Sequence, residues 1–227
     1  MSYTKQESLK EFDGWSSVYD GSILQRLLFV PSHNCMLGEI GQASHSLKLL
    51  DIGCGTGSFA RRVLKGRADA EVWGVDFSYK MICAGRGQGY PEGDRVRFVQ
   101  ADSESLPLAD NTFDVVTCSN SFHHYPRQAV AVAEMYRVLK PGGRLMIIDG
   151  YRDRHWGRFI YDVCVVAVEG AVQHASARRF RELFLGAGFR GVRQQATLGL
   201  APFLLTVGTA EKATRVAGQT LPPVAAA

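Results

Sequence analysis

Short β-branched or apolar runs alternate with helical patterns from Leu47 onward. This alternation is typical of a parallel sheet with helices on both of its faces. A helix is expected at 126–140, where the apolar residues form one stripe, and Pro141-Gly142-Gly143 would end it. The predicted strands of the sheet are 47–51, 71–75, 95–100, 113–118 and 143–149.

The last part of this pattern is different. Residues 177–186 have helical spacing, and two strand-like runs, 189–197 and 201–209, follow with only a short connection between them. A connection this short allows only an antiparallel pair of strands. The predicted fold class is therefore α/β, with a mostly parallel sheet that ends in an antiparallel pair.

Two aromatic-rich segments precede or interrupt the alternating pattern. Residues 1–46 come before it and residues 151–176 lie within it, and we expect both to form a helical cap over the sheet. The core would then span 47–210. Residues 211–227, which include Pro222-Pro223 and the terminal alanines, are predicted to be a flexible tail.

The length, composition and net charge of the chain are those of a globular protein and give no sign of a nucleic-acid partner. A chain of 227 residues has room for one α/β domain with a cap, and 46% hydrophobic and 21% charged residues are ordinary values for a globular protein. The formal charge of +4 is small and scattered along the chain, so we expect no nucleic-acid partner.

The cysteines and the apolar segments of the chain indicate the cellular compartment that we expect for the protein. The five cysteines are widely spaced without a C-x-x-C motif, which predicts neither a disulfide framework nor a zinc site. Residues 1–11 lack the apolar core of a signal peptide, and the most apolar later run, 159–168, is too short to span a bilayer. We expect a cytoplasmic protein without a membrane span.

A glycine-rich loop follows the first predicted strand. Gly53, Gly55 and Gly57 alternate with other residues, and glycines there permit a sharp turn and let a ligand approach the backbone at the carboxyl end of the strand. A tight turn without a ligand needs fewer glycines. The loop therefore predicts a ligand site.

The loop pattern alone fits two kinds of cofactor. Residues 55–60 satisfy the dinucleotide pattern G-x-G-x-x-G/A, and Asp76 follows at the right distance. Asp51, however, would repel a pyrophosphate at the loop by roughly 1 to 4 kcal/mol at about 4 Å. S-adenosylmethionine has no phosphate and carries a sulfonium and an ammonium, which a carboxylate attracts.

Acidic residues follow three consecutive strands at one edge of the predicted sheet. Asp51 would lie beside the methionine end of S-adenosylmethionine, Asp76 would accept from its ribose hydroxyls and Asp102 from its adenine amine. Each acid by itself is also explained as a helix N-cap. The occurrence of all three together favours the nucleoside.

Four segments together resemble the class I S-adenosylmethionine-dependent methyltransferases, in particular the branch of quinone-biosynthesis and small-molecule methyltransferases. They are DIGCGTG at 51–57, GVDFSYKMI at 74–82, and the segments 99–124 and 134–149. The resemblance implies a Rossmann-like, seven-stranded sheet of order 3-2-1-4-5-7-6 with the last strand antiparallel. It also implies methyl transfer to a small-molecule acceptor.

Matching positions imply a set of cofactor contacts. Besides the three glycines and the three acids, these are Phe77 and Met81 at the adenine face, Ser103 at its edge, and Ser119, Asn120 and Phe122 near the methionine and methyl groups. Tyr19 ends a segment, 12–20, that looks like the family's cofactor-covering segment. It is implied as a cofactor or substrate contact, although packing in an amphipathic helix explains it as well.

Two histidines follow the fourth predicted strand, at the edge nearest the methyl group. His123 and His124 have reference pKa values near neutrality and are the best general-base candidates, although hydrogen bonding in the loop before Pro126 also explains either one. Tyr19 is another catalytic candidate. Tyr125, His155 and His174 are weaker ones, and no metal ligand set is predicted because the histidines lack a metal-ligand spacing.

Three functions stay open on the residues alone. The first is S-adenosylmethionine-dependent methyl transfer to a small, partly apolar acceptor, achieved mainly by positioning. The second is an NAD(P)-dependent oxidoreductase. The third is a non-catalytic cofactor-binding protein whose cap serves a partner protein.

Overall fold

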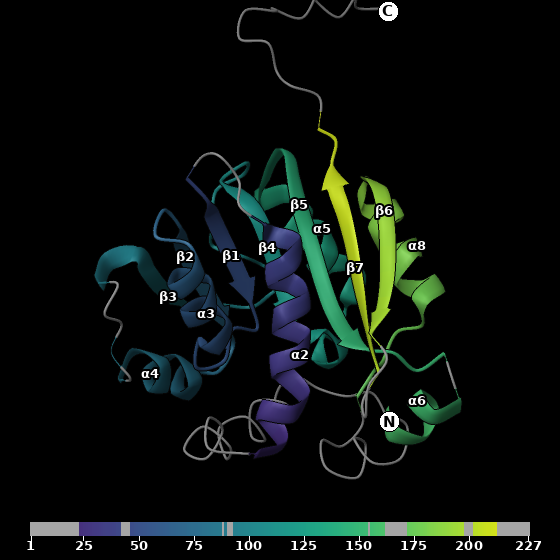
Figure 1. The fold of residues 1–227 in the computed structure, drawn as a ribbon. Helices are drawn as coiled ribbons and strands as arrows, with labels where there is room; N and C mark the ends of the chain where they lie inside the picture. The colour runs from purple at the N-terminus through teal and green to yellow at the C-terminus, as the bar shows by residue number, and fades with distance from the viewer. Residues whose placement is uncertain are drawn as a thin grey trace, which may run out of the picture.

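The fold of the chain is given by a computed structural model, which describes residues 23–41, 46–87, 89, 93–153, 155–161, 172–197 and 202–212 (Figure 1). Its seven strands form one sheet of order β3-β2-β1-β4-β5-β7-β6. The strands are β1 (Lys48–Ile52), β2 (Glu71–Asp76), β3 (Val96–Gln100), β4 (Phe113–Ser119), β5 (Leu139–Gly150), β6 (Phe189–Thr197) and β7 (Phe203–Ala210).

The described helices connect or cover these strands. The α-helices are α2 (Ile23–Ile40), α3 (Ser58–Gly66), α4 (Tyr79–Gly87), α5 (Gln128–Val138), α6 (His155–Phe159) and α8 (Ala177–Ala187), and the short 3-10 helices are η2 (Gly93–Arg95) and η3 (Phe122–His124). Within the described residues, every helix is too short or too polar to cross a bilayer.

Strand directions confirm the predicted topology. β1, β2, β3, β4 and β5 pair in parallel, whereas β7 runs antiparallel to both of its neighbours, β5 and β6. The chain reverses its direction of growth between β3 and β4, so the carboxyl ends of β1 and β4 lie side by side. Open α/β sheets bind their ligands at such a point.

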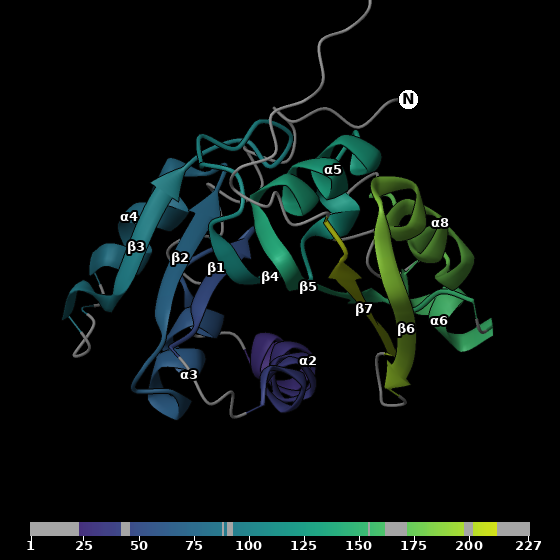
Figure 2. The ribbon, with the colours of Figure 1, turned by 90° about the horizontal axis from the view of Figure 1, so that it is seen from above.

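Alternating side chains of the sheet form two cores. In β1, Leu50 and Ile52 pack into a buried cluster with residues of α5 and α8, whereas Leu49 packs into a second cluster with residues of α2 and α3. Figure 2 shows α5 and α8 on one face of the sheet and α2 and α3 on the other. This period of two follows from the strand geometry and fixes which side chains end at the sheet edge.

One predicted boundary is wrong. We expected a strand at 143–149 that begins after the Pro-Gly-Gly sequence, but β5 begins at Leu139, directly after α5. The pairing of β4 with β5 shifts register between Phe113, opposite Leu139, and Val115, opposite Arg144. The extra residues on β5 therefore form a bulge, which absorbs the proline and glycines without ending the strand.

The predicted cap is described only in part. In residues 1–46, α2 packs Met36 and Ile40 into the core cluster of α3, so this helix covers the sheet. In residues 151–176, the short helix α6 is described. The rest of the cap with Tyr19, and the tail beyond residue 212, lie outside the described residues.

Candidate active site

The glycine loop turns sharply between β1 and α3. Gly53, Gly55 and Gly57 have positive φ values of 70°, 54° and 77°, in a region that other residues rarely adopt. The Gly53 amide donates to the Val75 carbonyl oxygen at 2.8 Å, which ties the loop to β2. A Cβ atom on Gly53 would overlap the Ser121 hydroxyl, so this position has no room for a side chain.

A cleft of about 800 Å³, partly open to solvent, lies beside this loop at the carboxyl edge of the sheet. Nine of the predicted contact residues line it: Gly53, Gly55, Asp76, Phe77, Met81, Asp102, Ser103, Ser119 and Asn120. The structure thus brings together residues from the ends of β1, β2, β3 and β4.

Asp76 connects the loop to the cleft. Its Oδ2 accepts a hydrogen bond from the Gly55 amide at 2.7 Å, and its Oδ1 accepts one from the Ser78 amide at 2.9 Å. Burial raises the pKa of Asp76, and these backbone hydrogen bonds oppose the rise. A carboxylate has about four acceptor positions, so Asp76 keeps capacity for ligand hydroxyls.

Asp51 lies on the other side of the loop. It lines a second, smaller cavity of about 340 Å³ together with His33 and Asn120, and its Oδ1 accepts a hydrogen bond from the Thr117 hydroxyl at 2.7 Å. Burial raises the pKa of Asp51 to about 7, the Thr117 hydrogen bond opposes this, and the Asp76 charge adds to it. Asp51 is therefore only partly ionised at neutral pH, so it repels a pyrophosphate less than the sequence argument assumed.

Asn120 lies between the two cavities and lines both. It adopts a left-handed backbone conformation with φ 52°, which asparagine tolerates better than most residues. Its amide nitrogen donates to Ser32 Oγ at 2.9 Å and to Ser119 Oγ at 3.1 Å. Its Oδ1 is buried and has no hydrogen-bond partner among the described residues, so it offers an acceptor to a ligand that donates.

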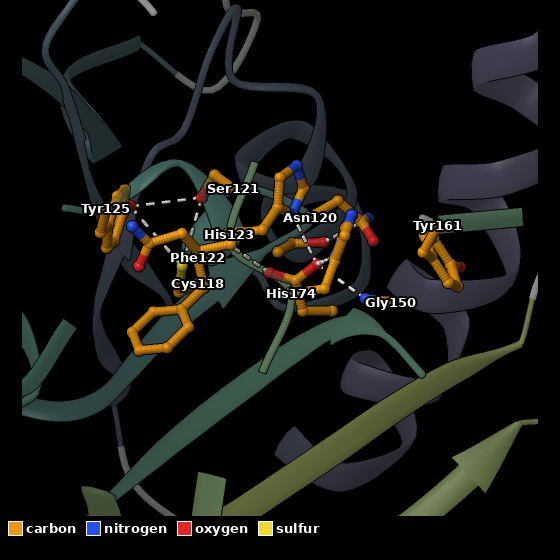
Figure 3. Close-up of polar contacts among 12 residues, drawn as sticks. Cys118, Asn120, Ser121, Phe122, His123, Tyr125, Gly150, Tyr161 and His174 are labelled. Carbon is orange, nitrogen blue, oxygen red and sulfur yellow. Dashed lines mark hydrogen bonds and ion pairs between the residues drawn. The ribbon is translucent and has the colours of Figure 1, made fainter. Parts of the chain in front are cut away.

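The two candidate histidines have different surroundings. His124 lines the cleft. His123 lies behind it: its Nδ1 is 2.7 Å from Asp149 Oδ1, and its backbone amide donates to Asp149 Oδ2 at 2.9 Å (Figure 3). The ring centroids of the two histidines are 4.2 Å apart. Burial, and then the neighbouring His123, lower the pKa of His124 well below its ordinary value, so its imidazole is neutral at pH 7.

The structure does not bring every predicted residue to the main cleft. Phe122 is fully buried and packs against Phe180 in the core. Gly57 is the N-cap of α3 and is not among the lining residues, and Asp51 faces the smaller cavity instead. Tyr19 lies outside the described residues.

Asp149 was missed in the sequence, and His174 was named there only as a weaker general-base candidate, without its place beside His123. Asp149 holds His123, and His174 lies next to the pair, with its Nδ1 3.8 Å from Asp149 Oδ1. Asp149 lies at the end of a strand, as Asp51 and Asp76 do, so the same signal that singled out those acids would have found it. His174 is distant in sequence from both partners, so no local pattern predicts that it lies next to them.

The class I methyltransferase fold is defined by the strand order found here, by an antiparallel β7, and by a glycine loop with acidic residues at the strand ends. The comparison with known proteins agrees. Residues 50–147 match the family model described as a methyltransferase domain.

Two curated relatives illustrate this similarity. A demethylmenaquinone methyltransferase of Thermus thermophilus is 38% identical over 102 residues, which cover 45% of this chain and 46% of the relative. A ubiquinone/menaquinone biosynthesis C-methyltransferase of Dinoroseobacter shibae is 42% identical over 104 residues, 45% of this chain and 42% of the relative. The chain thus matches less than half the length of these relatives.

Solved structures show the same fold at low sequence identity. A putative methyltransferase of Haloferax volcanii, solved with the Trm112 activator, has a TM-score of 0.75 and 20% identity, and the match covers 92% of this chain and 99% of that one. A methyltransferase of Thermotoga maritima, described as a possible histamine N-methyltransferase, has a TM-score of 0.70 and 23% identity over 88% of this chain and 98% of that one.

Proposed function

We propose that the chain transfers a methyl group from S-adenosylmethionine to a small, partly apolar acceptor. The observation that supports this most is the composition of the main cleft: Asp76 and Asn120 offer acceptors to a ligand rich in donors, and His124 lines the same cleft. A phosphate-free nucleoside with an ammonium group fits such a set of acceptors. A pyrophosphate would meet carboxylates there.

The residues present fit this cofactor. Asp76 would hold the ribose hydroxyls and Asp102 the adenine amine, while Phe77, which is 40% exposed, and Met81 would contact the adenine faces. The unpartnered Oδ1 of Asn120 would accept from the ammonium group. Gly53 and Gly55 leave space for the methionine portion because they have no side chains.

The mechanism that we propose is mainly one of positioning. When bound, S-adenosylmethionine would supply a methyl group on a positively charged sulfur, which would keep the electron pair of the broken bond and leave as a neutral thioether. Residues that hold the two reactants in line provide an effect worth about 7 to 11 kcal/mol in favourable models. The neutral His124 imidazole takes the proton that the acceptor loses. The ring of His123 packs against the His124 ring, and Asp149 fixes His123 in turn.

The acceptor that we propose to test first is a reduced quinone. The curated relatives are named for menaquinone and ubiquinone biosynthesis, and the methyltransferase-domain model matches residues 50–147, which include most of the cleft lining. A quinol has an ionisable hydroxyl and an apolar ring, which suits a neutral histidine as the base and the apolar side chains of Tyr125 and Pro126, which line the cleft next to His124.

The direct test is incubation of the purified chain with methyl-labelled S-adenosylmethionine and a demethylated quinol, followed by mass spectrometry. Label in the quinol supports both the reaction and the acceptor class. If the quinol stays unlabelled, the incubation is repeated with a fractionated cell extract. A labelled compound in the extract would identify a different acceptor, and the absence of any labelled compound would indicate a non-catalytic protein.

Asp76→Ala is expected to weaken the binding of S-adenosylhomocysteine by about 1 to 3 kcal/mol, roughly 5- to 150-fold, because it leaves ribose donors unpaired. Isothermal titration calorimetry measures this. Asp110→Ala, an exposed aspartate far from the cleft residues, is the matched control. Equal affinity for Asp76→Ala and the wild type would remove Asp76 from the binding site.

Asp51 predicts a pH dependence of cofactor binding. With a pKa of about 7, its ionised fraction rises from about one tenth at pH 6 to about nine tenths at pH 8. An ammonium near it favours the ionised form, so we expect affinity for S-adenosylmethionine to rise up to about tenfold across this range. Calorimetry at several pH values checks this, and Asp51→Asn should give a flatter profile. A wild-type affinity that falls as the pH rises would contradict this role.

A further inference from the structure

Three side chains of metal-ligating types meet next to His124, from distant parts of the chain, and Figure 3 labels two of them, His123 and His174. His123 belongs to η3, Asp149 lies near the end of β5, and His174 precedes α8. One possible ligand atom of each lies within 4.8 Å of the other two. Their side chains are only 7%, 3% and 2% exposed, so this cluster is separate from the cavity-lining residues.

His174 carries the observation that points to a missing ligand. Both of its ring nitrogens are buried, and neither has a hydrogen-bond partner within the described parts of the chain. Its Nδ1 is 3.8 Å from Asp149 Oδ1, beyond hydrogen-bond range. The rings of His123 and Tyr161, with centroids 4.5 and 4.7 Å away, hold the imidazole in place. Buried polar atoms without a partner are rare in native proteins, and each needs an explanation.

Asp149 is already held in a fixed position by hydrogen bonds to both of its oxygens. Its Oδ1 accepts from the Gly150 amide at 2.7 Å and lies 2.7 Å from His123 Nδ1, and its Oδ2 accepts from the His123 amide at 2.9 Å. A fixed carboxylate beside two imidazoles is a ligand set that divalent transition metals accept.

We propose that His123, Asp149 and His174 bind one divalent transition-metal ion that takes nitrogen and oxygen ligands, such as Zn²⁺. The ion would link η3, the end of β5 and the segment before α8, directly behind His124. Three protein ligands leave one position of a tetrahedral ion for water or another ligand. This proposal does not rest on methyl transfer.

The test is a titration of the full chain, freed of metal with a chelator and dialysed. Isothermal titration calorimetry with ZnCl₂ is expected to saturate at one equivalent, and CoCl₂ is expected to produce visible absorption bands of a four- or five-coordinate ion. His174→Ala should weaken Zn²⁺ binding by at least about 100-fold, since even the loss of residues outside the ligand shell costs about 10- to 100-fold. His155→Ala, which removes an exposed histidine of α6, is the control and should bind as the wild type does.

A thermal measurement keeps the proposal testable if His174→Ala folds poorly. His174→Phe keeps a ring in the packed position and removes both unpartnered nitrogens, so without metal its melting temperature should equal or exceed that of the wild type. Zn²⁺ should raise the melting temperature of the wild type and of His155→Ala but not that of His174→Phe. The proposal is overturned if the wild type does not bind one equivalent, or if either His174 variant binds Zn²⁺ as tightly as the wild type.

Discussion

Replacement of His124 by alanine is expected to lower the turnover number for methyl transfer by about 10²- to 10⁴-fold, the range typical of the loss of a general base. Of the three clustered histidines, His124 is the one that lines the cleft, and its imidazole is neutral at pH 7. Affinity for S-adenosylhomocysteine should stay within about threefold, since the proposed cofactor contacts are other residues. Steady-state kinetics and calorimetry measure the two quantities separately.

Two further variants locate the effect. His155→Ala removes an exposed histidine and should leave turnover unchanged. His123→Ala should also lower turnover, but by less than His124→Ala, because His123 acts through its neighbour and does not line the cleft. If His124→Ala retains full turnover, the base lies elsewhere and neither histidine takes part in proton transfer.

Gly53→Ala is the substitution with the largest expected effect on the fold of the site. The new Cβ would overlap the Ser121 hydroxyl and lie 2.7 Å from its Cβ, and overpacking of this kind costs about 1 to 3 kcal/mol. The positive φ of Gly53 adds about 1 to 2 kcal/mol for a residue with a side chain. Together these predict a loss of about 2 to 5 kcal/mol of unfolding free energy, measured by urea denaturation, and a loss of cofactor binding.

Gly66→Ala is the matched control for that substitution. Gly66 is the last residue of α3, its φ is not positive, and a Cβ there meets nothing within 4 Å. Alanine is the better helix former, so this variant should be as stable as the wild type or slightly more stable. A similar stability for Gly53→Ala would show that the loop can rearrange, and the account of its shape would be wrong.

The sequence predicted the sheet well because each strand carries a local signal. Apolar runs gave the strands, the short connection after residue 197 gave the antiparallel pair, and the resemblance gave the order, which the structure confirms. The start of β5 was missed because Pro141 and two glycines read as a strand boundary. A bulge tolerates these residues through a register shift, and this depends on the pairing with β4, which is not a local property.

The site shows the same division between local and distant information. Nine predicted contacts line one cleft because the residue that ends a strand lies at the sheet edge whatever the rest of the chain does. Phe122 was misplaced because the 3-10 turn of η3 directs it into the core and leaves His124 at the cleft. The raised pKa of Asp51 depends on its burial between elements that are distant in sequence. The position of His174 beside Asp149 depends on how the segment before α8 packs. Neither follows from a local pattern.

Cofactor choice is the claim on which the whole account depends, and one calorimetric comparison tests it most directly. The purified chain is titrated with S-adenosylhomocysteine and, in a parallel experiment, with NAD⁺ and NADP⁺. We predict saturable binding of S-adenosylhomocysteine at one equivalent and no measurable heat with either dinucleotide. Saturable binding of a dinucleotide, with no heat from S-adenosylhomocysteine, would contradict the account.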